Sequence, residues 1–255
     1  MIVNRIDKGW EVVYQPAHAL LSAQLAGRWQ VKTRPIRWWQ TLNAVALHDN
    51  GWHEWEAAPK ITDKGAPRNF TQMTPSDAIA QWRRGVARGA HQNRWVGLLI
   101  SRHATSLYKG REGELHELDH FLSEQVAQQQ SWMQELNVTE EEVECAYAMI
   151  RWTDWLSLIL CWRRLPANEQ PITVGKGSDG VNYEVRASRN GRILLSPWPF
   201  EPEAFSVSVE TRRLEQDVFE DDATLASALA KAPIIVRQWD LVSAQVNYLE
   251  SVWRG

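Results

Sequence analysis

The sequence has no surplus of positive charge. Its 255 residues include 28 Lys or Arg and 31 Asp or Glu, which gives a formal net charge of -3. A nucleic-acid-binding protein usually carries a basic patch that neutralises phosphates. The doublets Arg83-Arg84 and Arg163-Arg164 are too small to form such a patch. We therefore expect no nucleic-acid partner.

Cysteines are few, and long apolar runs are missing. Cys145 and Cys161 are sixteen residues apart on one predicted helix, which places their Cα atoms about 24 Å apart at 1.5 Å per residue. This distance is far beyond disulfide reach, so both should be free thiols. No run approaches the roughly 18 apolar residues that span a bilayer, and residues 1–9 lack the apolar stretch of a secretory signal. These features predict a cytoplasmic protein without a membrane partner.

Apolar residues make up 44% of the chain and charged residues 23%, as in an ordinary globular protein with one sizeable core. The fifteen tryptophans are unusual. Trp52 and Trp55, and also Trp152 and Trp155, lie close in sequence to candidate ligands described below. They can be ordinary core residues, or they can form the walls of an aromatic pocket.

Helical periodicity dominates the first two thirds of the chain. It predicts helices over about 16–29, 37–48, 75–90, 95–108, 113–136 and 139–165. Residues 1–15 resemble a short strand, and 57–74 a long loop that could cover a site. After Pro166 the pattern predicts a hairpin at 181–196, strands at 205–209 and 234–241, and a helix at 222–232. We expect a mainly α fold, with a helical domain (1–166) and a small β-rich α+β subdomain (167–255) packed on it.

Ionisable residues occupy the apolar faces of four predicted helices: His18, the pair His48-Asp49, His103 and Asp154. An ionisable group buried without a partner is costly, so these groups need a shared partner. A divalent metal held by His18, His48, Asp49 and Asp154 would supply it. Imidazole and carboxylate ligands suit Zn, Fe, Mn or Ni. The pattern favours one such ion as cofactor.

The order of these ligands, with His18 and His48 thirty positions apart, resembles the HD-domain superfamily of metal-dependent phosphohydrolases. The segments QPAHALLSAQLAGRW, ALHDNGW, RHATSLY, DWLSLILC and SPWPF also resemble a bacterial family of HD-like proteins whose activity is not established. The wider resemblance implies a helical metal site and hydrolysis of a phosphoester or phosphoanhydride. Residues 50–54 differ from those that follow the pair in nucleotide-cleaving relatives, so no substrate is implied.

In this interpretation Asp49 is both ligand and catalytic residue, and His103 contacts the phosphate or moves a proton. Arg102, Lys109 and Trp52 are candidate contacts for a small-molecule substrate. For Arg102 and Lys109 a solvated helix face is the simpler explanation. A homo-oligomer is possible.

Other functions remain open at this point. The motif His116-Glu117-Leu118-Asp119-His120 fits the H-E-x-x-H pattern of zinc proteases, but its two histidines fall on the polar side of their helix. A non-catalytic ligand-binding or regulatory protein is the main alternative. An iron-dependent oxygenase of the HD type is a lesser one.

Overall fold

A computed structural model describes residues 1–110, 116–166, 170–244 and 246. Within this part of the chain the helices are α1 (Gln15–Gly27), α2 (Trp38–Leu47), α3 (His53–Ala57), α4 (Pro75–Gln92), α5 (Arg94–Leu107), α6 (His116–Leu136), α7 (Glu140–Cys161) and α8 (Asp222–Lys231). The six helices predicted from periodicity are thus present near their expected positions. The start predicted for α6, residue 113, lies outside the described residues.

Local sequence explains where the helices begin. Thr139 and Glu142 form the capping box expected before α7, each bonding the other's backbone N–H. Asn93 caps α5 through the backbone N–H of Trp95. Pro16 lies in the first turn of α1, where its missing N–H has no helical partner to lose.

The strands form one mixed sheet of seven, in the order β1-β2-β6-β7-β5-β4-β3. They are β1 (Ile2–Arg5), β2 (Trp10–Val13), β3 (Ile172–Lys176), β4 (Asn182–Ala187), β5 (Ile193–Ser196), β6 (Ala204–Leu214) and β7 (Ile234–Val242). All neighbours pair antiparallel except β5 and β7. The predicted hairpin is confirmed as β4 and β5, with Gly191 at a φ of 79° in its turn.

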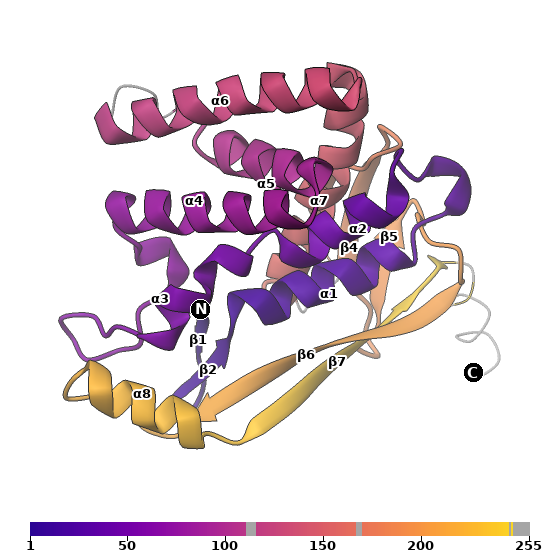
Figure 1. Ribbon diagram of the computed structural model, residues 1–255. Coiled ribbons are helices and arrows are strands. Elements are labelled where there is room, and N and C mark those ends of the chain that lie inside the picture. The colour runs from indigo at the N-terminus through magenta and orange to yellow at the C-terminus, as the bar shows by residue number, and fades with distance from the viewer. Residues whose placement is uncertain (111–115, 167–169, 245, 247–255) are drawn as a thin grey trace.

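The predicted fold class, a mainly α bundle with a small β subdomain, is wrong. The sheet is large: β6 has eleven residues and β7 nine, and β6 runs along α1 with β7 paired beside it (Figure 1). The N-terminal strands belong to the same sheet, because Trp10 pairs with Leu214. Strands of four residues carry too little alternation to reveal so distant a partner. The division into domains at residue 166 stays a prediction.

Helices and sheet share one hydrophobic core. Trp29, two residues beyond the end of α1, contacts Trp152 of α7, Tyr183 of β4 and Phe200 edge-on. Trp152 is therefore a core residue rather than a pocket wall. The Gln24 side chain links α1 to the sheet by two hydrogen bonds, one donated to and one accepted from the backbone of Ser208 in β6. These contacts fix α1 and α7, the two helices that carry His18 and Asp154.

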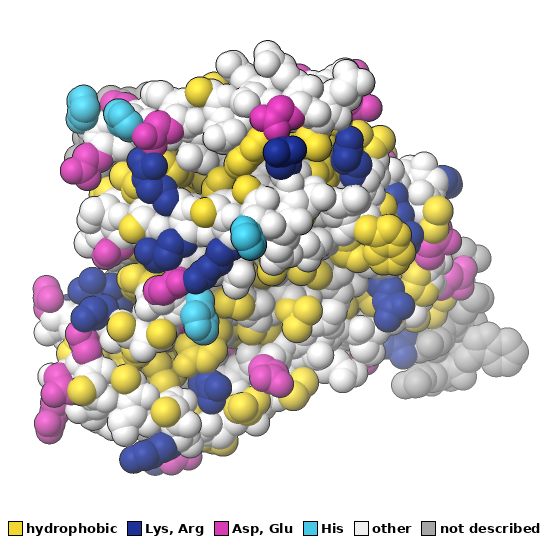
Figure 2. Space-filling view, viewed as in Figure 1, with side chains coloured by type: hydrophobic (Ala, Val, Ile, Leu, Met, Phe, Trp, Pro, Cys, Tyr) yellow, Lys and Arg dark blue, Asp and Glu magenta, His cyan; other side chains and the backbone are white. Residues whose placement is uncertain are grey.

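Both cysteines are free, as predicted. No helix in the described ranges is long and apolar enough to cross a membrane. Acidic and basic side chains are interspersed on the face seen in Figure 2.

Candidate metal centre

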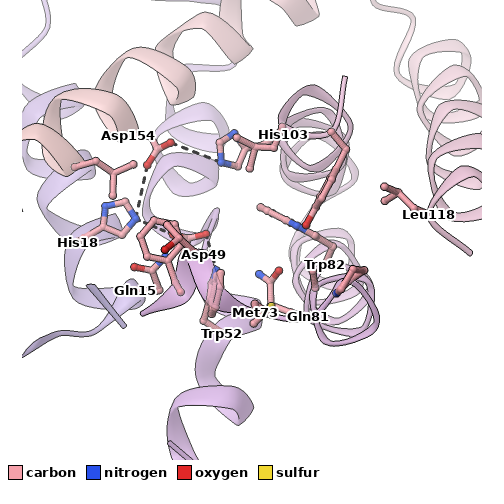
Figure 3. A pocket seen from close by; sticks show the side chains of 17 residues that line it. Gln15, His18, Asp49, Trp52, Met73, Gln81, Trp82, His103, Leu118 and Asp154 are labelled. Atoms are coloured by element: carbon pink, nitrogen blue, oxygen red, sulfur yellow. Dashed lines mark hydrogen bonds and ion pairs between the residues drawn. The ribbon is translucent and has the colours of Figure 1, made fainter. Parts of the chain in front are cut away.

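Five of the residues singled out above meet inside the protein. His18 comes from α1 and Asp154 from α7, while His103 comes from α5. His48 ends α2, and Asp49 follows it directly. The three imidazoles and Asp49 are buried, and the Asp154 side chain is 13% exposed. Figure 3 shows His18, Asp49, His103 and Asp154 around one cavity.

The two carboxylates face imidazole Nε2 atoms. His18 Nε2 lies 2.7 Å from Asp49 Oδ2 and 3.7 Å from Asp154 Oδ1. His48 Nε2 lies 3.5 Å and 3.4 Å from the same two oxygens. His103 Nε2 lies 3.8 Å from the other oxygen of Asp154. The ligand atoms of four helices thus converge on a small volume.

The opposite ring nitrogens are held by neighbours. His48 Nδ1 lies 2.7 Å from the carbonyl oxygen of Val45, an acceptor, so this nitrogen carries the proton. His18 Nδ1 lies 2.7 Å from Ser157 Oγ, whose own hydroxyl donates to the carbonyl of Asp154. Such contacts fix the tautomer and orientation of metal-ligating histidines. With Nδ1 engaged in this way, Nε2 of each ring is the nitrogen that faces the carboxylates.

One nitrogen of this cluster lacks a hydrogen bond. His48 Nε2 makes no hydrogen bond, although the ring is fully buried. His18, His48 and Asp49 each offer an atom within 4.8 Å of the other two, as do His48, His103 and Asp154. These residue types are the ones that transition metals prefer in proteins. The residues present thus fit a divalent metal ion, and His48 Nε2, which makes no hydrogen bond, is a position that could coordinate it.

The histidines and carboxylates of the cluster shift one another's pKa values. Burial alone would lower the pKa of His48, but Asp49 and Asp154 outweigh it and raise the pKa to about 9. Burial would likewise raise the pKa of both carboxylates, but the histidines outweigh it and lower the pKa of each below its ordinary value. Burial lowers the pKa of His103 to about 4, because Asp154 offsets the effect only in part. At neutral pH both carboxylates are charged and His103 is neutral.

The cluster borders a cavity of about 610 Å³. Trp52 and Trp82 line it, as do Gln15 and Gln81. Trp52 also donates from Nε1 to Asp49 Oδ1 at 3.1 Å, so it is both wall and support. The predicted loop borders the cavity through residues 70, 71 and 73, around the short 3-10 helix Phe70–Gln72.

The other predicted contacts lie elsewhere. Arg102 forms ion pairs with Glu140 and Glu144, and it donates to Gln129 on α6. Lys109 is exposed. Neither is among the residues that line the cavity.

The H-E-x-x-H motif is also separate from the site. His116, Glu117 and His120 are exposed, as the helical wheel indicates, and Figure 2 shows histidines at the surface where α6 begins. His120 forms an ion pair with Glu124, one turn further along α6. In the described part of the chain, both groups that could hold a metal lie in the buried cluster.

Comparison with known proteins gives a family but no activity. Residues 1–216 match the model of a protein of unknown function (DUF3891). The chain belongs to this family. A comparison with curated proteins and another with solved structures each found no match. The family description names no reaction and no link to the HD-domain superfamily, so that likeness stays a prediction.

Three residues of the site escaped the sequence analysis: Ser157, Gln15 and Gln81. Ser157 and Gln81 lie among apolar neighbours on α7 and α4 and are fully buried. The signal that identified His18, a polar residue on an apolar helix face, was therefore present for both. Gln15 gave no such signal, because it is the first residue of its helix.

Proposed function

We propose that this protein is a metal-dependent phosphohydrolase of the HD type that acts on a small phosphorylated substrate. The observation that carries the proposal is the buried cluster of three imidazoles and two ionised carboxylates at the edge of a cavity. His18, His48, Asp49 and Asp154 would hold one divalent Zn, Fe, Mn or Ni ion. Both possible ligand groups include His48, whose single free nitrogen serves one ion.

A bound divalent ion would polarise a phosphoryl oxygen and lower the pKa of a coordinated water. The chain's own residues would do the rest. His103 is neutral at pH 7 and lines the cavity, so its Nε2 can accept a proton from an attacking water. Asp49 is oriented from both sides, by His18 and by the indole of Trp52. Arg102 and Lys109 take no part in this mechanism, because neither lines the cavity.

The first experiment is elemental analysis of the purified protein beside His48→Ala and Asp154→Ala. Circular dichroism would check that both variants fold. His116→Ala is the matched control, since it removes an exposed histidine. We expect about one equivalent of a transition metal in the wild type and the control, and none in the other two. A folded His48→Ala protein that keeps its metal would contradict the site.

Activity is tested separately with a panel of phosphomonoesters, phosphodiesters and nucleotides, using Asp49→Ala as the blank. Turnover that needs the metal and disappears in the blank would support hydrolysis. A metal-loaded wild type with no turnover above the blank on any member would reject the hydrolase and favour a non-catalytic ligand-binding protein. We also propose that the partner is a small molecule and that the protein acts in the cytoplasm.

A further inference from the structure

A second set of unpaired polar atoms lies in the cavity wall. Gln81 on α4 is fully buried, and neither its amide nitrogen nor its amide oxygen has a hydrogen-bond partner. Figure 3 shows this amide pointing into the space between Asp49 and Trp82. Gln15 at the start of α1 is 2% exposed, and its Oε1 is also unpaired. Both glutamines line the cavity that holds the metal cluster.

Other buried glutamines of this protein are paired. Gln129 on α6 is 3% exposed, and its amide nitrogen donates to Ser101 at 2.9 Å and to Thr105 at 3.2 Å. Its oxygen accepts from Arg102. A buried amide that makes no hydrogen bond loses its contacts with water and gains nothing in return. Gln81 therefore needs a partner that enters from the cavity.

Gln81 is held in place by backbone packing. A Cβ at Gly51 would lie 2.3 Å from the backbone oxygen of Gln81 and 3.1 Å from its amide nitrogen. The lack of a side chain at residue 51 lets α4 approach the segment that follows Asp49. The backbone of Gln81 is thus held close to the segment that follows Asp49, which limits the entropy lost when its side chain binds a ligand.

We propose that Gln81, assisted by Gln15, binds a carboxamide-like group of the substrate. Such a group is planar and uncharged, and it carries a hydrogen-bond donor beside an acceptor, as primary amides and lactams do. An amide side chain has the complementary acceptor and donor and can bond both at once. Trp52 and Trp82 offer apolar ring surface in the same cavity. The other end of the substrate would reach the metal cluster, and this part alone rests on the proposed function.

The test compares benzamide with acetophenone, which has the same shape and the acceptor but no donor. Dissociation constants would be measured by ligand-observed NMR on the metal-loaded protein. We expect the wild type to bind benzamide at least about tenfold more tightly than acetophenone, because a buried unpaired acceptor penalises the ketone. Gln81→Met should lose this preference, and the matched control Gln129→Met should keep it. Equal affinities in the wild type, or a preference retained in Gln81→Met, would overturn the proposal.

Thermal unfolding tests whether Gln81 recognises the ligand or supports the fold. Gln81→Met should be at least as stable as the wild type, because it removes no hydrogen bond, whereas Gln129→Met should be less stable. A less stable Gln81→Met protein that keeps the preference would make Gln81 a structural residue. Gln81→Glu retains the shape and the acceptor and loses the donor, so it should keep the preference for benzamide while binding both ligands more weakly. It is the second variant if Gln81→Met does not fold, and loss of the preference in it would contradict the proposal. The wild type freed of metal by a chelator should keep the preference for benzamide, so a failed phosphatase screen does not decide this proposal.

Discussion

Glu11 and Asp49 are buried to the same degree, since each side chain is 8% exposed, but their surroundings differ. Glu11 on β2 pairs with Arg163 at 2.7 Å and with Arg237 at 2.8 Å. Arg237 also donates to the carbonyls of Leu160 and Cys161, at the end of α7. Every charge of this cluster has a partner within the chain. It ties the sheet to α7 and has a structural role.

Asp49 lies in a cluster that is incomplete by comparison. His48 Nε2 next to it has no hydrogen bond, and the amide of Gln81 in the same cavity has none. Native proteins leave few buried polar atoms unpaired, and those that remain usually have a functional reason. Burial of a carboxylate therefore does not by itself identify a functional site. Unpaired polar atoms around the buried carboxylate are the better indicator.

The two clusters should differ most in stability when each carboxylate is removed from the metal-free protein. Glu11→Ala should lower the free energy of unfolding by about 3 kcal/mol, because Arg237 keeps a buried charge that it cannot release. This value is at the lower end for buried pairs, since the Arg163 side chain is 51% exposed. Asp49→Ala should cost less, because the imidazoles left behind can lose their protons. Urea unfolding in the presence of a chelator measures both.

Metal content supplies the control for this pair. Glu11→Ala should retain the full metal equivalent, and Asp49→Ala should lose it. The comparison fails if the Glu11 variant releases the metal as readily as the Asp49 variant does.

A sharper test removes a supporting group and leaves the ligands. Ser157→Ala takes away the hydroxyl that orients His18, and we expect the metal affinity to fall about 10- to 100-fold. Competition with a chromogenic chelator measures this change. Ser101→Ala is the matched control, because Ser101 is also a fully buried serine but bonds Gln125 and Gln129 outside the site. It should lower stability and leave metal affinity unchanged. Equal affinities of the two variants would contradict the role of Ser157.

The sequence predicted which ionisable residues meet in the buried cluster better than it predicted the fold around them. His18, His48, His103 and Asp154 stood out because each is an ionisable residue on the apolar face of its own helix, and helical periodicity is local information. The sheet depends on partners far apart in the chain, as in the pairing of Trp10 with Leu214. No local pattern encodes such a pairing.

Two of the predicted substrate contacts, Arg102 and Lys109, lie away from the cavity for a related reason. Arg102 was chosen for its charge and its place beside His103, but successive helix residues point in different directions. Arg102 therefore reaches Glu140 on α7 while His103 faces the cavity. Gln81 was missed because an uncharged amide attracts less attention than an ionisable group, although the physical cost of leaving either unpaired in the interior is the same in kind.

The ion pairs of Glu11 should also make the stability of the protein depend on pH. Burial would raise the pKa of Glu11, but the hydrogen bond from Arg163 and the charge of Arg237 outweigh it and lower the pKa below its ordinary value. A carboxylate with a lowered pKa stabilises the fold above its unfolded pKa of about 4.5. This stabilisation is lost as the pH falls through the lower folded value. The difference in unfolding free energy between the wild type and Glu11→Gln should therefore shrink as the pH falls below about 4.5. Chelator-treated samples measured by urea unfolding at each pH would show it, and a constant difference would argue against the ion pairs.

The smallest effect is expected at the H-E-x-x-H motif. His116→Ala and His120→Ala should each change the free energy of unfolding by no more than about 0.5 kcal/mol, because exposed residues and exposed ion pairs contribute little. Both histidines are exposed, and His120 has a neighbour in Glu124 rather than a converging set of ligands. Metal content should equal that of the wild type in both variants, while His48→Ala loses the ion. The opposite pattern, with metal lost from His116→Ala and kept in His48→Ala, would move the metal site to α6 and leave the buried cluster as a polar core network.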